Sequence, residues 1–592
     1  MAHRLSEINI QNYKSIISET FELSDYTPLI GYNNAGKSNI LNAIKWLLRK
    51  GSLQNDSFNQ VGSPVVVEGK IEGIDNNLLQ NLTAAHRASI QPYLDGDSLR
   101  IKRVQNAPGD TAASIRLFVF NTTAVAPADP WTANPAGIDN AINALFPEPI
   151  QIGAMENAEE DVSKSKATTT IGKLLAEIIE PIEQQYGAQV RGVLDGLRDL
   201  LDSEGVNRAP ELTQFDADVN QKIDVFFPDI NIKLHVPTPE LKEVFNKGTI
   251  KVYEQRLPGG RDVSALGHGA QRSIQMALVR HLAELKRARQ VHLTTTLLLI
   301  DEPELYLHPQ AIEVIRDALK TLSTQGYQVI FSTHTAMMTT HEDVGNAILI
   351  RKSTVRGTYK RTTLKSAIPQ VEQDAPSQLR LLFSLSNSSN ILFSERVILT
   401  EGQTEQRVLP KIIEKVTGKS LGLHKCALVQ QGGVASSRKS MLVLTTMDLP
   451  NKTIVDLDYV FKYGVREGYL QANDPDLAAC HQQMARIAAP NGIVLSGDGW
   501  PVNPLSAMSA AQAIRLLAAE PQIQPNLNAL HAKLLPHNIW IWKKGAIEDH
   551  IGLPGKSEQV WANFVNQLNV GTFQNAVVDH AEVEACVRWV LV

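Results

Sequence analysis

Apolar and polar residues follow three different patterns in the first part of the chain. Alternation in 5–23 predicts two strands joined by a turn, each with one buried face. Apolar residues recur every three or four positions in 39–50, which predicts an amphipathic helix. The segments 65–74 and 100–104 have the pattern of strands, whereas 121–165 has weak periodicity and predicts loops.

The clearest helical pattern consists of two apolar stripes, at 171–182 and 190–201. These stripes predict a hairpin-like pair of helices. Such a pair either packs on its own domain or projects as a contact between two copies of the chain, and the pattern alone favours packing within the domain. No heptad repeat continues long enough to predict an extended coiled-coil arm.

Strands and helices then alternate in two separate series. The first consists of a strand at 296–300, a helix at 309–323 and a strand at 328–335. This order is typical of a βαβ unit and predicts a buried parallel sheet, so the expected fold class is α/β. A second α/β series begins near residue 395, and the polar stretch 384–390 marks the expected boundary between the two series.

Length, charge and cysteine content narrow the class of protein. The 592 residues exceed what one hydrophobic core supports, so we expect several domains. The formal net charge of -5 means that any contact with nucleic acid must use a local basic patch. The three cysteines form no CxxC pair, and no apolar run approaches the roughly 20 residues of a membrane helix. We therefore expect a cytoplasmic protein with no membrane partner.

A phosphate-binding motif follows a short apolar strand and leads into the predicted helix. The motif has the pattern GxxxxGK(S/T), and its fixed positions are Gly31, Gly36, Lys37 and Ser38. Glycines let backbone N–H groups curl around phosphate, and the helix N-terminus adds positive potential. We expect Lys37 to reach the β- and γ-phosphates of ATP and Ser38 to bind Mg²⁺, with Asn34 in the loop that surrounds the phosphates.

Two carboxylates end the apolar strand at 296–300. Asp301 is in the position to hold the Mg²⁺ shell, and Glu302 is in the position to polarise the attacking water. A solvated strand end does not explain this acidic pair in a chain that already carries a phosphate loop. His334 follows the next apolar strand, where it would contact the γ-phosphate, although a lone histidine is more often structural.

A second acidic group begins the C-terminal series. Glu401 directly follows an apolar strand, and Glu405 lies one helical turn later. Asp456 and Asp458 end another strand, and in an extended chain they point to the same face. Carboxylates gathered at one sheet edge repel one another, and Mg²⁺ or Mn²⁺ relieves that repulsion. Two such ions clamp both oxygens of an in-line phosphodiester displacement, whereas a solvated sheet edge is the alternative reading.

The nucleotide motifs resemble those of the ABC-type ATPases, in the branch of DNA-repair and chromosome-structure proteins. The resemblance implies that ATP lies between two heads and that a signature loop from one head caps the ATP of the other. The candidate loop is 266–272, in which Gly267 stands in place of the usual serine and Gly269 follows it. The sequence does not place the glutamine loop of that family, for which Gln54 and Gln60 are candidates.

The acidic motif resembles the Toprim fold of topoisomerases, primases and certain nucleases. The order of a head and then Toprim resembles the OLD (overcoming lysogenization defect) nuclease family, which includes the nuclease subunit of Gabija anti-phage systems. The segment 542–548 also resembles one in that family. The resemblance implies that Glu548 helps to bind metal and that Lys543 or Lys544 stabilises charge at the scissile phosphate.

The same resemblance implies a division of the chain into an ABC-type ATPase head, a helical dimerisation insert and a Toprim nuclease domain. The head would comprise 1–150 and 241–390, the insert 151–240, and the nuclease domain 391–592.

The implied function is an ATP-gated, divalent-metal-dependent DNA endonuclease that acts as a homodimer or homotetramer in bacterial anti-phage defence. ATP and Mg²⁺ or Mn²⁺ are the implied cofactors, and a helicase or a retron reverse transcriptase with its RNA–DNA product is a candidate partner. The alternative is a non-catalytic ATP-dependent DNA clamp or damage sensor in which Toprim only binds. A topoisomerase or primase ranks third, because a topoisomerase needs a tyrosine nucleophile from an additional domain.

Overall fold

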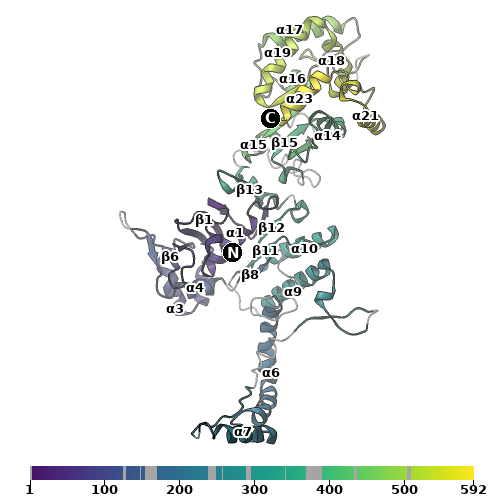
Figure 1. Cartoon of the computed structure of the whole chain (residues 1–592). Coiled ribbons are helices and arrows are strands. Elements are labelled where there is room, and N and C mark those ends of the chain that lie inside the picture. The colour runs from purple at the N-terminus through teal and green to yellow at the C-terminus, as the bar shows by residue number, and fades with distance from the viewer. Residues whose placement is uncertain are drawn as a thin grey trace.

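The chain forms an elongated molecule with a long projecting helix at one end and the C-terminal part at the other (Figure 1). The computed structural model describes residues 3–592 except 125–128, 147–148, 154–169, 228, 238–248, 256–257, 289–294, 341, 368–389, 432–436 and 503–507. Within those described residues, every helix is too short or too polar to span a bilayer.

A mixed sheet of twelve strands forms the middle of the molecule, in the order β7-β6-β5-β4-β1-β2-β14-β13-β3-β12-β11-β8. The strands that pair antiparallel are β1 (Arg4–Tyr13), β2 (Ile16–Glu22), β4 (Val65–Glu72), β5 (Leu99–Gln105), β6 (Arg116–Phe120), β7 (Trp131–Ala133) and β14 (Gly357–Lys360). The strands that pair parallel are β3 (Tyr26–Ile30), β8 (Ile150–Ile152), β11 (Thr296–Asp301), β12 (Tyr327–Thr333) and β13 (Ile348–Ser353), the last of which also pairs antiparallel with β14. The parallel sheet predicted from the first α/β series is therefore confirmed.

Helices cover both faces of the parallel half because its strands are apolar on both faces. Along β11, Leu297 and Leu299 pack in one core with helix α1 (Lys37–Leu48). Their neighbours Leu298 and Ile300 pack in a second core with α9 (His268–Ala288) and α10 (Pro309–Ser323). The alternation of side chains along one strand thus holds the phosphate-loop helix and the two later helices on opposite faces.

The loops predicted for 121–165 are wrong in part. This region contains β7 and β8 and the helix α4 (Ile138–Leu145), which buries Ile138, Ala141, Ile142 and Leu145. Both strands have three residues, which is too short for any alternation to be recognised in the sequence. They exist because they complete the two edges of a large sheet, and pairing along that sheet is not encoded locally.

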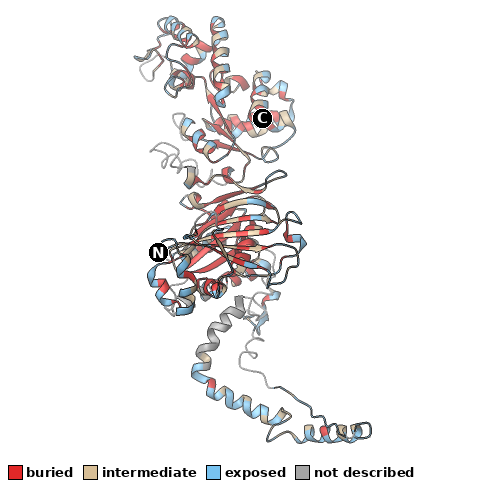
Figure 2. Ribbon diagram, turned by 90° about the vertical axis from the view of Figure 1, so that its left-hand side faces the viewer, coloured by how far each residue is buried: buried red, intermediate tan, exposed pale blue. Residues whose placement is uncertain are grey.

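The two helices predicted at 171–201 are one helix. Helix α6 (Thr170–Leu201) has 32 residues and projects from the sheet toward α7 (Pro210–Ile223) (Figure 1). The polar residues between its two apolar stripes are helix-compatible, and the single Gly187 there costs only about 1 kcal/mol. Its far part and α7 are mostly exposed (Figure 2), so the expected packing within the domain does not occur there.

The C-terminal part is built on a parallel sheet of four strands in the order β16-β15-β17-β18. Its strands are β15 (Arg396–Thr400), β16 (Cys426–Gln430), β17 (Asn451–Asp456) and β18 (Ile539–Trp542). Its helices of eight or more residues are α14 (Gln403–Thr417), α15 (Ser437–Thr446), α17 (Pro475–Ala488), α18 (Ala510–Ala519), α19 (Gln524–Leu534), α21 (Glu558–Val570) and α23 (His580–Leu591). The second α/β series is therefore confirmed, whereas most of the boundary expected at 384–390 lies outside the described residues.

Candidate functional site

The backbone of the phosphate loop adopts conformations that favour glycine and asparagine. It connects β3 to α1, and Gly36 and Asn34 have positive φ angles of 101° and 65°. A Cβ at Gly36 would overlap the side chain of Thr358, and a Cβ at Gly31 would lie 2.5 Å from the carbonyl oxygen of Ile350. Because α1 begins at Lys37, its first N–H groups are available to an anion held by this loop.

The structure brings the two predicted Mg²⁺ ligands of this loop together. Ser38 Oγ donates a hydrogen bond of 2.6 Å to Asp301 Oδ2, and Ser332 Oγ donates to the other oxygen of the same carboxylate. Lys37 is buried, and its Nζ donates to the carbonyl oxygens of Gly31 at 2.8 Å and Tyr32 at 3.2 Å. Burial lowers the pKa of Lys37, while the charge of Glu302 acts in the opposite direction.

His334 and Glu302 lie beside one another at the same strand ends. The Nδ1 atom of His334 is 3.7 Å from Glu302 Oε1 and 3.4 Å from Glu304 Oε1. Sequence reasoning missed Glu304, which is buried and accepts hydrogen bonds from Thr333 Oγ1 at 2.6 Å and from the backbone N–H of His334 at 2.9 Å. A third acid two residues after Glu302 was the signal for it.

The predicted signature loop lies at the start of α9. Gly267 directly precedes this helix, and a Cβ at Gly269 would lie 2.7 Å from the carbonyl oxygen of Tyr306. Arg272, on the same helix, donates hydrogen bonds to the carbonyl oxygens of Asp301 at 2.9 Å and Glu302 at 3.2 Å. Arg272 therefore connects α9 to the end of β11, where Asp301 and Glu302 lie. Sequence reasoning missed this contact.

Carboxylates from four elements meet at the C-terminal edge of the four-stranded sheet. Glu401 follows β15, and its Oε2 accepts a hydrogen bond of 3.2 Å from the backbone N–H of Asp456, the last residue of β17. Glu405 is buried in the first turn of α14. Asp458 begins the short helix α16 (Asp458–Tyr463), and its Oδ2 is 2.7 Å from Lys462 Nζ. The expectation that Asp456 and Asp458 share an extended strand is wrong, because the chain turns into a helix at Leu457.

Glu548 joins this group from the short helix α20 (Ile547–Ile551). Its Oε1 accepts a hydrogen bond of 2.5 Å from Thr404 Oγ1 and lies 3.2 Å from Lys556 Nζ. Its Oε2 is buried and has no hydrogen-bond partner among the described residues. A buried carboxylate oxygen without a partner is costly, and a bound cation would satisfy it.

Burial and mutual repulsion both favour the neutral forms of Glu401, Glu405 and Asp456. Burial, followed by the charge of Asp458, raises the pKa of Glu401 to about 7. Burial, followed by the charges of Glu548 and Glu401, raises the pKa of Glu405 to about 7. The pKa of Asp456 is also raised well above its usual value, by burial and then by Glu401. A divalent cation reverses both causes, since it compensates the repulsion and replaces the lost hydration.

The donor set suits a hard cation, but its side chains are not yet gathered around one point. In the part of the chain that the structure describes, no three histidine, cysteine, aspartate or glutamate side chains are arranged as ligands of one metal ion. The five predicted ligands Glu401, Glu405, Asp456, Asp458 and Glu548 are all carboxylates, the ligands that Mg²⁺ and Mn²⁺ prefer. Binding would therefore require side-chain rotations within a group that the fold has already assembled.

The two predicted lysines, Lys543 and Lys544, directly follow β18 at this edge but pair with acids outside the group of five carboxylates. Lys543 Nζ lies 3.0 Å from Glu582 Oε2, and Lys544 Nζ lies 2.8 Å from Asp579 Oδ2. Both lysines thus pair with acids at the start of α23. Lys556 is the cation that most lowers the pKa values of Glu401, Glu405 and Asp456. It lies in the polar loop after α20, where the sequence gives no pattern that would have identified it.

Two family models match the regions of the chain that contain the two sites. Residues 4–103 and 139–339 match the family model described as AAA ATPase domain. Residues 392–458 match the model described as overcoming lysogenization defect protein-like, TOPRIM domain. The first range set contains the phosphate loop, Asp301, Glu302 and His334, and the second contains Glu401, Glu405, Asp456 and Asp458.

Three relatives align with most of the chain. The chain is 37% identical over 601 residues to the Old nuclease of Escherichia phage P2, and the alignment covers 100% of both chains. It is 22% identical over 474 residues to the OLD nuclease of Thermus scotoductus, covering 77% of this chain and 82% of the relative. It is 24% identical over 426 residues to Endonuclease GajA of Bacillus cereus, covering 70% and 68%.

Proposed function

The chain belongs to the OLD family of nucleases, with an ATPase head and a Toprim domain, and from this membership we propose that it is an ATP-gated, divalent-metal-dependent DNA endonuclease. The single observation that carries the metal-dependent chemistry is the group of carboxylates at the edge of the four-stranded sheet. The second candidate, a clamp that only binds DNA, gives no reason for a group of acids whose pKa values burial raises.

Each residue of the carboxylate edge has a proposed role. Glu401, Glu405, Asp456, Asp458 and Glu548 would hold Mg²⁺ or Mn²⁺. The bound ions would supply Lewis-acid stabilisation of the phosphodiester and an activated water. Thr404 orients Glu548 through its hydrogen bond of 2.5 Å. Lys556, 3.2 Å from Glu548, is the lysine that we propose for stabilising charge at the scissile phosphate, in place of Lys543 and Lys544.

Cleavage is expected to depend on metal and on pH together. Glu401 and Glu405 have pKa values of about 7, so protons occupy them at lower pH and compete with the ion. We expect pure protein to nick or cut plasmid DNA with Mg²⁺ or Mn²⁺ and to lose this activity in EDTA. The metal concentration for half-maximal rate should rise as the pH falls from 8 to 6, measured by metal titrations at each pH. Cleavage that persists in EDTA after dialysis contradicts the proposal.

The head is proposed to bind and hydrolyse ATP with the residues that the phosphate loop and strand ends bring together. Lys37 would contact the phosphates, Ser38 and Asp301 would hold Mg²⁺, and Glu302 would polarise the attacking water, with His334 at the γ-phosphate. The backbone of Gly31, Asn34 and Gly36 would surround the phosphates. Gly267 and Gly269 are proposed to cap the ATP of a second head.

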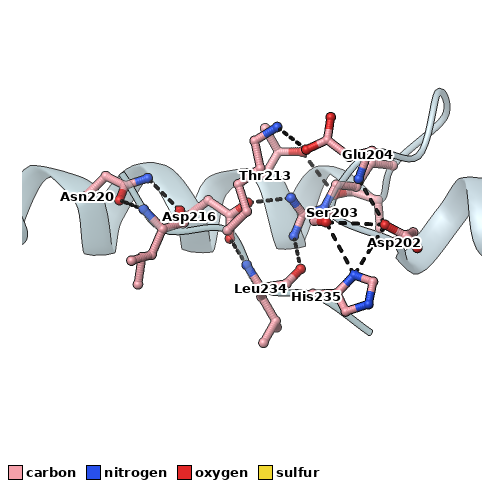
Figure 3. Close-up of polar contacts among 12 residues, drawn as sticks. Asp202, Ser203, Glu204, Thr213, Asp216, Asn220, Leu234 and His235 are labelled. Atoms are coloured by element: carbon pink, nitrogen blue, oxygen red, sulfur yellow. Dashed lines mark hydrogen bonds and ion pairs between the residues drawn. The ribbon is translucent and has the colours of Figure 1, made fainter. Parts of the chain in front are cut away.

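The tip of the insert has the character of a contact with a second copy of the chain. The segment after α7 is held along that helix by side-chain to backbone bonds (Figure 3). Asn220 pairs with both backbone groups of Ile232, at 2.7 and 2.8 Å, and Asp216 accepts from the N–H of Leu234 at 2.9 Å. These bonds fix a tip on which Val225, Phe226 and Phe227 are 80%, 75% and 60% exposed. So much apolar surface on a fixed tip favours a partner, and we propose that 151–240 is a dimerisation insert.

Charging this tip should weaken self-association. We expect the double variant Phe226→Asp/Phe227→Asp to raise the dissociation constant of the dimer at least about tenfold, because an aromatic hot spot at the centre of an interface contributes about 2 kcal/mol or more. Sedimentation velocity over a concentration series measures this. Val355→Asp, at an exposed valine between β13 and β14, is the matched control. A wild-type protein that is monomeric throughout, or a double variant that associates as the wild type does, contradicts the assignment.

The biological setting follows from the family. We propose that the nuclease is an effector of bacterial anti-phage defence, alone or with a helicase or a retron reverse transcriptase and its RNA–DNA product. The proposed division of the chain is a head in 1–150 and 241–390, the insert in 151–240 and the nuclease domain in 391–592. The change from the large sheet to the four-stranded sheet between β14 and β15 supports the last boundary.

A further inference from the structure

The phosphate loop directly contacts the C-terminal domain through one side chain. Tyr32, the second residue of the loop, presents its ring to two cations. Lys425 Nζ lies 5.2 Å from the ring centroid, and the guanidinium carbon of Arg351 lies 5.9 Å from it. Lys425 directly precedes β16 of the four-stranded sheet, whereas Arg351 belongs to β13 of the large sheet. The ring of Tyr32 is therefore shared between the nucleotide site and the domain that carries the carboxylates.

The position of this ring is tied to the loop on the head side. The Tyr32 hydroxyl donates to the carbonyl oxygen of Lys352 at 3.1 Å and accepts from its N–H at 3.2 Å. The carbonyl oxygen of Tyr32 accepts a hydrogen bond of 3.2 Å from Lys37 Nζ, the lysine expected to contact phosphate. A displacement of the ring therefore displaces a group that holds Lys37.

The backbone of Lys425 is fixed on the nuclease side, whereas its side chain is exposed. Its backbone is in the left-handed region, with φ of 53°, and its N–H donates to the carbonyl oxygen of Gly422 at 3.0 Å. Its carbonyl oxygen accepts a hydrogen bond of 2.9 Å from Glu395, which directly precedes β15. Strand β15 leads to Glu401, so the backbone of Lys425 is linked to the strand that positions a proposed metal ligand.

Arg351 completes the link between the two sides. Its side chain is 1% exposed, and its Nε lies 3.4 Å from Glu395 Oε1. Its guanidinium donates hydrogen bonds of 3.0 Å to the carbonyl oxygens of Leu392 and Ser394. A buried guanidinium with these partners holds the start of the C-terminal domain against the strand beside the phosphate loop.

We propose that Lys425 is a positioning residue of the nucleotide site: acting through the ring of Tyr32, it holds the phosphate loop in its binding conformation from the nuclease domain. The proposal deepens the proposed function, because it rests on ATP binding at this loop. Its consequence is coupling in both directions, since any contact that changes nucleotide affinity is changed in turn by the nucleotide. Nucleotide binding at the phosphate loop thereby affects Lys425 and the start of β15.

The test is a titration of a fluorescent ATP analogue, N-methylanthraniloyl-ATP, with the full chain and Mg²⁺. We expect Lys425→Ala to raise the dissociation constant about threefold to fivefold, the effect of losing a cation–π contact made by an exposed lysine. Lys425→Arg keeps a cation over the ring and should bind within about twofold of the wild type. Lys419→Ala removes an exposed lysine from the same domain and is the matched control, expected to bind as the wild type does.

A double-mutant cycle separates action through Tyr32 from a general loss of structure. In a Tyr32→Leu background, Lys425→Ala should have no further effect on the dissociation constant, because the ring through which it acts is absent. The proposal is overturned if Lys425→Ala leaves the dissociation constant unchanged or if Lys425→Arg fails to restore binding. It is also overturned if Lys425→Ala raises the dissociation constant equally in the Tyr32→Leu background. A wild-type protein that binds no ATP contradicts the proposed function itself, and the positioning role falls with it.

Discussion

Asp456→Asn is expected to lower the rate of DNA cleavage by about 10³-fold or more, since a metal ion that stabilises the transition state contributes several kcal/mol. The substitution is nearly isosteric and removes one charge from the end of β17. The backbone N–H of this residue still donates to Glu401, so the local hydrogen bond survives. What is lost is the anionic oxygen that, with Glu401 and Glu405, we expect to hold the ion.

The measurement is the rate of plasmid nicking at saturating Mg²⁺, with ATP hydrolysis followed in the same preparations. ATP hydrolysis should be unchanged, because Asp456 lies in the four-stranded sheet and not in the head. Asp448→Asn is the matched control: Asp448 is an exposed acid just before the opposite end of the same strand, and it should cleave as the wild type does. Cleavage by Asp456→Asn at a rate near that of the wild type would exclude the carboxylate edge as the cutting site.

Many residues of the nucleotide site and of the carboxylate group were predictable because each directly follows an apolar run in the sequence. The phosphate loop, Asp301 and His334 each follow an apolar run, and the parallel sheet then brings those ends to one edge. Glu401 and Asp456 follow the same logic in the second sheet. The predicted family and the order of an ATPase head before Toprim are confirmed, whereas the roles of the individual residues stay predictions.

The contacts that sequence reasoning missed depend on tertiary structure. Lys556 lies in a loop with no periodicity, and only the packing of α20 against α14 brings it to the carboxylates. Arg272 reaches the acidic strand end because α9 packs beside β11, which no spacing in the sequence encodes. The lysines chosen from the family segment pair instead with Glu582 and Asp579, whose positions depend on the docking of α23.

The predictions of secondary structure that were wrong failed for a related reason. The two apolar stripes of α6 suggested two helices because a run of mostly polar residues separates them. The helix itself continues, because nothing between the stripes breaks it. Asp458 was placed on a strand because alternation cannot show that the chain enters a helix at Leu457.

Glu302→Gln should separate ATP binding from ATP hydrolysis. We expect the rate of hydrolysis to fall about 10²-fold to 10⁴-fold, the range that a positioned general base contributes. Binding should persist, because Lys37, Ser38 and Asp301 are unchanged, and the amide keeps an oxygen near His334. Glu313→Gln, at an exposed glutamate of α10, is the matched control and should hydrolyse ATP as the wild type does.

The same variant tests whether ATP gates the nuclease. In the wild type, the rate of DNA cleavage should change when ATP is added and return to its ATP-free value as the ATP is consumed. In Glu302→Gln, the rate should change in the same direction and then stay constant, because the nucleotide remains bound. Time courses of nicking with limiting ATP measure both behaviours. A wild-type rate that is indifferent to ATP contradicts the gating, and undiminished hydrolysis in Glu302→Gln contradicts its role as the base. If only the variant keeps the cleavage rate of the ATP-bound state, then nucleotide bound at the phosphate loop sets the activity of the cutting site. The phosphate loop lies beside the contact of Tyr32 with Lys425.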